Sequence, residues 1–239
     1  SGYLKRKFLK KIDIKKLKKN FLLEEKDSKK YTNYDQKIFD KEYSKTVFME
    51  GYFESEKYFS SFKDEIKKQF VPKIDFNFEK NKYLSMIKNS ESVSLCIRQN
   101  RFSEKYNNIS QQDYNKSKQF VVDQINFINM AISYFKKKLK NPTFFLWSND
   151  FSNLKNELYD KNIVYINNRF YNNDVERIHC DLFLMRKCKH FAVIPSAFNW
   201  WGCWLAETKE SIILRPGNNH YTNLEIKNRD YWPTHWKEI

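Results

Sequence analysis

From Val93 onward the chain alternates between short apolar runs and longer amphipathic segments. The short runs are rich in aliphatic and aromatic side chains, which is typical of buried strands. They occupy residues 93–98, 144–148, 163–166, 191–194 and 211–214. Helix-like segments separate them, at about 115–140, 151–161, 174–189 and 197–209. A strand and helix order repeated four times predicts an α/β fold, in which a parallel sheet carries helices on both faces.

The first 90 residues have a different pattern. We expect a short strand at 46–53, an amphipathic helix over about 56–70 and another helix near 79–88. These elements are too few for a second complete α/β domain. The expected organisation is therefore a partial N-terminal region (1–90), a doubly wound domain (91–216) and a C-terminal tail (217–239).

The chain is basic, with a formal net charge of +15, and nine Lys or Arg stand against one Asp in residues 1–20. An apolar stripe runs through this segment at roughly helical spacing: Leu4, Phe8, Ile12 and Leu17. The segment is either an ordinary surface helix or an amphipathic helix that touches an anionic membrane surface or phosphates. The charge and the many aromatic residues also suit a nucleic-acid-binding protein, although no recognised nucleic-acid-binding motif is present.

No apolar run is long enough to span a membrane, and lysines interrupt the N-terminal apolar residues, unlike a secretory signal. We therefore expect a cytoplasmic protein, at most peripheral to a membrane. The cysteines lack the spacing of a zinc site or a disulfide scaffold, so we expect buried, reduced thiols. They are Cys96, Cys180, Cys188 and Cys203. We expect neither a metal ion nor a cofactor.

Ligands of open parallel sheets bind at the carboxyl ends of the strands, and this rule selects a short set of segments. The segments are 98–101, 148–150, 167–168, 195–196 and 215–216.

Ser196 follows one expected strand and is suited to cap the helix that begins at Ala197. The backbone N–H groups of that helix terminus would form an anion site, especially for phosphate. Within the helix, Phe198, Trp201 and Leu205 fall on one face, which would anchor it to the sheet, and Gly202 allows close backbone approach. In the alternative interpretation, Ser196 is only a cap and the tryptophans are only core.

Arg98 ends the first strand of the expected sheet, on the same face as Cys96. Its guanidinium could bind a diphosphate, assisted by Arg101, or could simply be solvated at a strand end. Asp181 lies in an expected helix among apolar residues, where a bare carboxylate would be costly. Asp181 therefore needs a hydrogen-bond donor, either from the protein or from a ligand.

Three stretches resemble the family 11 glycosyltransferases, the α-1,2-fucosyltransferases that use GDP-fucose. The longest is 181-DLFLMRKCKHFAVIPSAFNWWGCWLAE-207, similar to the family's run ending in Ser-x-Phe-Ser-Trp-Trp. The stretch 144-FFLWSNDFSNLKNEL-158 is similar to the family's strand ending in Ser-Asp-Asp, and 50-EGYFESEKYF-59 to its Gly-Tyr-Phe-Gln-Ser-Glu-Lys-Tyr-Phe segment. The similarity spans about residues 43–214.

The resemblance implies an inverting, metal-independent transferase with a GT-B-like pair of Rossmann-type domains. Residues 91–216 would bind the nucleotide-sugar donor, and residues 1–90 would face the glycan acceptor. It implies that Arg98 is catalytic because it neutralises the diphosphate, and that Asp181 pairs with guanine. The remaining donor-binding residues would be Ser196, Ala197 and Phe198 at the helix terminus, Asn149 and Asp150 in the cleft, and Cys96.

Two departures from the family pattern bear on function. Where the family has His-x-Arg-Arg-x-Asp, 96-CIRQNR-101 keeps only Arg98. The family's glycine-rich N-terminal segment is also absent, so we expect a truncated N-terminal domain. The alternatives are a transferase for another nucleotide sugar, or a non-catalytic relative that binds carbohydrate or nucleic acid. The catalytic base is open among Glu54, Glu104 and Asp113.

Overall fold

The computed structural model describes ten segments of the chain: residues 21–24, 34–40, 48–50, 53–70, 81–104, 112–158, 160–167, 174–217, 220–221 and 228–239. These segments belong to two compact units. The first comprises residues 1–61 and 225–233, and the second comprises 62–224 and 234–239. The lysine-rich segment 1–20 lies outside the described residues.

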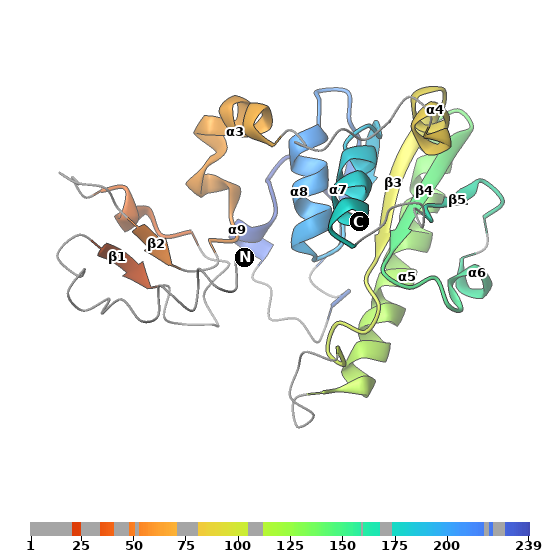
Figure 1. The fold of residues 1–239 in the computed structure, drawn as a ribbon, viewed down its shortest axis with the longest axis horizontal. Helices are drawn as coiled ribbons and strands as arrows, with labels where there is room; N and C mark the ends of the chain where they lie inside the picture. Colours follow the sequence, from red (N-terminus) through yellow and green to blue (C-terminus); the bar gives the residue numbers. More distant parts are fainter. Residues whose placement is uncertain are drawn as a thin grey trace. The chain divides into compact units, whose positions relative to one another are not determined.

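A six-stranded sheet in which every pairing is parallel forms the centre of the second unit (Figure 1). Its strands are β3 (Glu91–Ile97), β4 (Pro142–Ser148), β5 (Ile163–Tyr165), β6 (His190–Ala192), β7 (Ile213–Arg215) and β8 (Lys237–Glu238). The order is β5-β4-β3-β6-β7-β8, so the direction of winding reverses between β3 and β6. Such a reversal is the point at which doubly wound sheets bind ligands. The expected α/β fold with a parallel sheet is confirmed.

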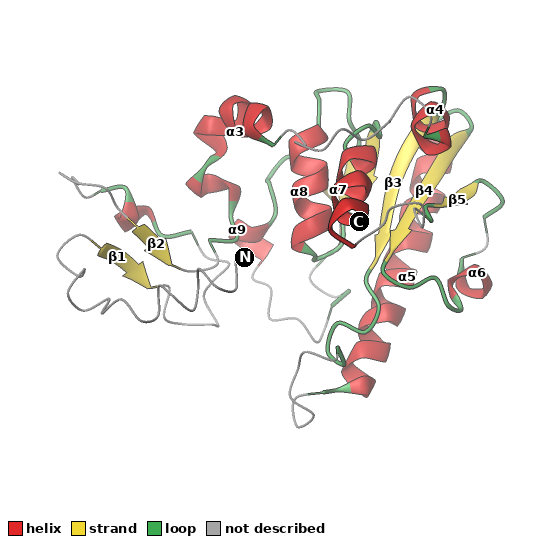
Figure 2. Ribbon diagram, in the orientation of Figure 1, coloured by secondary structure: helices red, strands yellow, loops and turns green. Residues whose placement is uncertain are grey.

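Helices cover both faces of this sheet, as expected: α5 lies on one face, and α7 and α8 lie on the other (Figure 2). The helices of the unit are α3 (Lys63–Gln69), α4 (Lys82–Lys88), α5 (Tyr114–Lys138), α6 (Leu154–Glu157), α7 (Asp174–Met185) and α8 (Ala197–Ala206). The helix expected at 151–161 shrinks to α6. Polar turns cause this, because Asp150 closes a turn onto Ser152 and Asn153 has a left-handed φ of 65°.

The sheet includes residues that the sequence pattern places in a tail. β8 pairs with β7, Leu214 opposite Lys237, whereas α9 (Asn228–Tyr231) belongs to the first unit. At the other end, α3 and α4 belong to the sheet unit rather than to the N-terminal region. The structure therefore differs from the expected boundaries at 90 and 216. The boundary at 216 was missed because a two-residue edge strand carries no apolar run that would reveal it.

The buried side of α8 differs from the expected one. Trp200 and Trp204 are buried, whereas Trp201 is half-buried and stacks on Phe70 with ring centroids 5.5 Å apart. The expected close approach at Gly202 is confirmed, because a Cβ there would overlap the sulfur of Met185 on α7. Helix α8 thus packs tightly against α7.

A buried carboxylate at the end of α8 joins three parts of the second unit. Glu207 pairs with Lys63 of α3 and accepts hydrogen bonds from Trp236 Nε1 at 2.7 Å and from His235 Nε2 at 2.9 Å. Burial by itself raises the pKa of Glu207, but these hydrogen bonds outweigh it and leave the pKa below its ordinary value. The cluster connects the C-terminal strand to α3 and α8.

The first unit is smaller. It contains a parallel pair, β1 (Phe21–Glu24) and β2 (Phe48–Glu50), and the short 3-10 turns η2 (Gln36–Ile38) and η3 (Glu56–Tyr58); the turn η4 (Ser60–Phe62) follows where the units meet in sequence. Asp230 of α9 accepts a hydrogen bond from the Tyr34 amide at 3.1 Å and pairs with Lys57 at 2.5 Å. The strand expected at 46–53 is present as β2, and the helix expected at 56–70 is divided into η3, η4 and α3.

Candidate functional site

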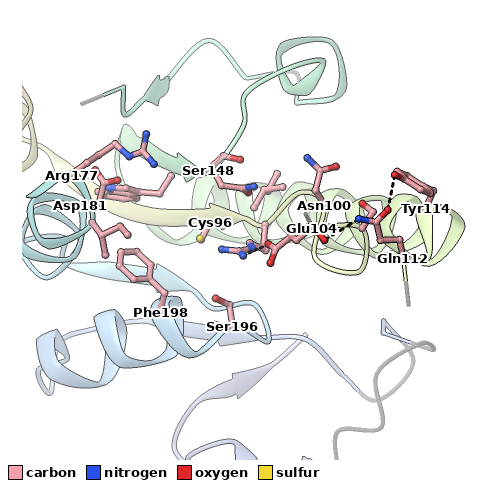
Figure 3. Close-up of a pocket in the computed structure, with 16 residues that line it drawn as sticks. Cys96, Asn100, Glu104, Gln112, Tyr114, Ser148, Arg177, Asp181, Ser196 and Phe198 are labelled. Carbon is pink, nitrogen blue, oxygen red and sulfur yellow. Dashed lines mark hydrogen bonds and ion pairs between the residues drawn. The ribbon is translucent and has the colours of Figure 1, made fainter. Parts of the chain in front are cut away.

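A cavity of about 720 Å³ opens at the carboxyl ends of β3, β4 and β6, within the size range of small-molecule sites. It is elongated: Arg177 and Asp181 lie at one end, Gln112 and Tyr114 lie at the other, and Ser196 lies between them (Figure 3). The cavity therefore occupies the switch point of the sheet.

Six of the eight residues expected to bind a donor line this cavity, although they come from four separate segments of the chain. They are Cys96, Arg98, Asn149, Asp181, Ser196 and Phe198. The other two, Ala197 and Asp150, are not among the lining residues. Ala197 is the exposed first residue of α8.

The carboxylate of Asp150 is engaged in hydrogen bonds within a turn. It accepts hydrogen bonds from the Ser152 amide at 2.8 Å and from the Ser152 hydroxyl at 2.6 Å. These bonds hold the pKa of Asp150 below its ordinary value. Asp150 therefore shapes the loop after β4, while its neighbour Asn149 reaches the cavity.

A buried glutamine on α5 positions Arg98. The Gln124 side chain accepts from the Arg98 amide at 2.7 Å and donates to the Arg98 carbonyl at 3.0 Å, and Gln124 is completely buried. The Arg98 guanidinium pairs with Glu104, and 42% of the Arg98 side chain is exposed. The backbone is thus held firmly at the strand end while the guanidinium faces the cavity. Gln124 was not anticipated, although a polar residue between the apolar positions Phe120 and Ile128 of a helix is a usable signal.

Ser196 occupies the N-cap position of α8, with φ −145° and ψ 127°, but its hydroxyl makes no capping hydrogen bond to the helix. The side chain of Asn199 instead accepts from the Ile194 amide at 2.7 Å and ties the end of the β6 segment to the helix. The expected cap position is correct and the expected capping bond is not formed. The Ser196 hydroxyl consequently lies at the cavity wall beside the N-terminus of a ten-residue helix.

Arg101 and Gln99, which stand at altered positions of the family motif, hold loops together. The Arg101 guanidinium donates to the Pro195 carbonyl at 2.6 Å and so connects the loop after β3 to the turn before α8. The Gln99 side chain donates to the Asp150 carbonyl at 2.7 Å, and the backbone N–H of Gln99 donates to the side-chain oxygen of Asn149 at 2.8 Å. Neither lines the cavity, so Arg101 supports the site without reaching into it.

Cys96 and Asp181 both line the cavity. Burial raises the pKa of the Cys96 thiol to about 12, nearby Arg98 lowers it, and the negative charge of Asp181 adds to the increase. Cys96 is therefore a neutral thiol. Asp181 is half-buried on α7, on the same helical face as Arg177 four residues earlier.

Of the three candidate bases, Glu104 lines the cavity. Asp113 caps α5 by accepting from the Lys116 amide at 2.8 Å, and Glu54 belongs to the first unit. Several lining residues were not anticipated from the sequence, because nothing local distinguishes them: Trp147, Arg177, Ile178, Gln112 and Tyr114.

The four cysteines are buried and free, as expected. Within the described segments, no three His, Cys, Asp or Glu side chains are grouped so that they could hold a metal ion. In the same segments, no helix combines the length and the apolar character that crossing a membrane would require.

Comparison with known proteins identifies two relatives and a family. The Alpha-1,2-colitosyltransferase of Escherichia coli is 24% identical over 192 residues, which is 79% of this chain and 61% of the relative. The O-antigen biosynthesis glycosyltransferase WbnK of Escherichia coli is 26% identical over 141 residues, which is 55% of this chain and 41% of the relative. The matched parts thus cover less than two thirds of either relative, and no solved structure is significantly similar. The model described as Glycosyl transferase family 11 matches residues 4–239, and the chain belongs to that family.

Proposed function

We propose that the chain transfers L-fucose from GDP-fucose to a galactose-type hydroxyl of a glycan, in α-1,2 linkage and with inversion. Membership of the family supports the general activity, which is that of a glycosyltransferase with a nucleotide-sugar donor and a glycan acceptor. The observation that supports the finer proposal is the convergence of Arg98, Ser196 and Asp181 on one cavity at the switch point.

In this proposal the donor lies along the cavity. The guanine base of the donor occupies the end of the cavity that contains Asp181, because a carboxylate accepts hydrogen bonds from the N–H groups of guanine. The diphosphate occupies the middle, between the Arg98 guanidinium and the N-terminus of α8, where the Ser196 hydroxyl and backbone N–H groups favour an anion. The sugar then reaches toward Glu104 and Tyr114.

The proposed reaction is a single displacement at the anomeric carbon. The acceptor oxygen forms a bond to that carbon as the bond to the β-phosphate oxygen breaks, and the electron pair leaves with GDP. Arg98 and the helix terminus stabilise the charge that develops on the departing diphosphate. Glu104 is the candidate base that lines the cavity, and its pair with Arg98 must open before it accepts the acceptor's proton. This scheme uses no metal ion or cofactor, so we expect activity to survive EDTA.

Colitose is a second candidate sugar, because one relative is named for colitosyl transfer. It differs from L-fucose in lacking the 3-hydroxyl, so the two donors would share their nucleotide contacts. We further propose that the sheet unit is the nucleotide-binding half of a GT-B-like pair. Contact of residues 1–20 with a membrane stays a prediction.

The test combines nucleotide binding with transfer. Calorimetric titration with GDP, UDP and GDP-fucose, with and without EDTA, should show selective binding of GDP that EDTA does not change. Transfer from GDP-fucose and GDP-colitose to a galactoside then identifies the sugar. Arg98→Ala should lower transfer by roughly 10²–10³-fold with little change in stability. The matched control is Arg215→Ala, which removes a guanidinium that pairs with Glu238 outside the cavity lining. A preference for UDP, or transfer by Arg98→Ala within a few-fold of wild type, would refute the proposal.

A further inference from the structure

The wall of the cavity includes a buried tryptophan. Trp147, near the end of β4, is 2% exposed and lines the cavity. Its indole Nε1 has no hydrogen-bond partner among the residues that the structure describes. Buried tryptophan N–H groups usually find an acceptor, since an unpaired buried donor costs free energy. A ligand in the cavity is the natural source of that acceptor.

Trp147 lies beside Cys96, because the two residues are opposite each other in the register of β3 and β4. The neutral Cys96 thiol is only a weak donor, and the aromatic ring of Phe198 adds a further apolar wall. Together with the Asp181 carboxylate, the indole gives the cavity lining one strong acceptor and one neutral donor. A ligand that pairs with both must offer N–H donors to the carboxylate and an acceptor to the indole.

Among the common nucleobases, guanine fits this pattern best. Its N1–H and N2–H groups together match a carboxylate, and the O6 carbonyl stands next to N1–H. Adenine has no carbonyl oxygen for the indole, and uracil offers one N–H between two carbonyls, which places an acceptor against the carboxylate. We propose that the Trp147 indole donates to guanine O6 while Asp181 accepts from N1–H and N2–H, so that Trp147 selects the base. This inference rests on the proposed use of a GDP-sugar.

The experiment compares wild type with Trp147→Phe, which removes the N–H and keeps an aromatic ring. Three ligands are titrated: GDP, 6-thio-GDP, in which a weaker sulfur acceptor replaces O6, and IDP, which lacks the 2-amino group. We expect Trp147→Phe to bind GDP about 3- to 10-fold more weakly. The wild type should bind 6-thio-GDP more weakly than GDP, and this preference should disappear in the variant. IDP should bind more weakly than GDP by the same factor in both proteins, because the missing 2-amino group is proposed to contact Asp181 and not Trp147. Equal affinities of both proteins for GDP, or an unchanged preference for GDP over 6-thio-GDP in the variant, would overturn the inference.

A stability control and a direct readout complete the test. Trp204→Phe truncates another buried indole, outside the cavity lining, and should destabilise the protein without changing GDP affinity. The six tryptophans contribute six indole N–H groups, which ¹⁵N labelling of tryptophan makes visible by NMR. The Trp147 resonance should shift downfield on GDP addition and less with 6-thio-GDP. If Trp147→Phe does not fold, this resonance is assigned by elimination with the other tryptophan variants, and its failure to shift would still overturn the inference. A wild type that binds no guanine nucleotide would instead refute the proposed function.

Discussion

Gln124→Leu should weaken both the stability of the sheet unit and its affinity for GDP. The wild-type amide makes two hydrogen bonds to the backbone of Arg98, at 2.7 and 3.0 Å, from a completely buried position. Leucine fills most of the same volume and can make neither bond. Each lost bond costs about 1 kcal/mol, and leaving the half-buried Arg98 amide and carbonyl without these partners adds to the loss. We therefore expect the free energy of unfolding to fall by about 2–4 kcal/mol, a large share of a typical domain's stability.

Binding should fall with it, because Arg98 is no longer held at the end of β3. Loss of a hydrogen bond to a charged group weakens GDP binding by about tenfold or more. Urea unfolding and calorimetry measure the two effects. Gln119→Leu is the matched control, since the Gln119 amide is exposed and bonds only Asp123 of its own helix, at 2.8 Å, among the contacts described. A Gln124→Leu variant as stable as Gln119→Leu, and with the same affinity for GDP, would refute the reasoning.

Four further outcomes follow from the packing and the charges. Gly202→Ala should lower the melting temperature and reduce the free energy of unfolding by about 1–3 kcal/mol, because the added methyl group overlaps Met185. An unchanged melting temperature would contradict the tight packing. Glu207→Gln should reduce the stability of the protein at neutral pH but change it little at acid pH. The lowered pKa of Glu207 stabilises the fold above the unfolded-state pKa, and this contribution is lost as the pH falls through the folded-state pKa. Urea unfolding measured at several pH values tests this. Ser196→Ala should weaken GDP binding several-fold yet leave unfolding within about 0.5 kcal/mol of wild type, since its hydroxyl does not cap α8; calorimetry and urea unfolding together test this. At pH 8 iodoacetamide should alkylate Cys96 far more slowly than a free thiol, as mass spectrometry of peptides can show, because its pKa is about 12.

Most of the sheet could be predicted because strand signals are local. The apolar run at 93–98 is β3 within a residue or two at each end, and the run at 144–148 lies within β4. β8 could not be predicted, since only backbone pairing with β7 defines it. The expected helix at 151–161 failed because side-chain hydrogen bonds in a turn compete with helix formation.

The strand pattern along the chain was enough to predict that Arg98 and Ser196 lie at the same edge of the sheet, because the carboxyl ends of successive parallel strands meet there. Tertiary structure decided what each side chain does at that edge. Asp150 bonds within its own loop, and Arg101 donates to the Pro195 carbonyl. Trp147 lines the cavity, and its indole N–H has no partner among the described residues. Hydrophobic periodicity is a local property of the sequence, whereas the hydrogen-bond partner of a polar group depends on residues distant in sequence and close in space.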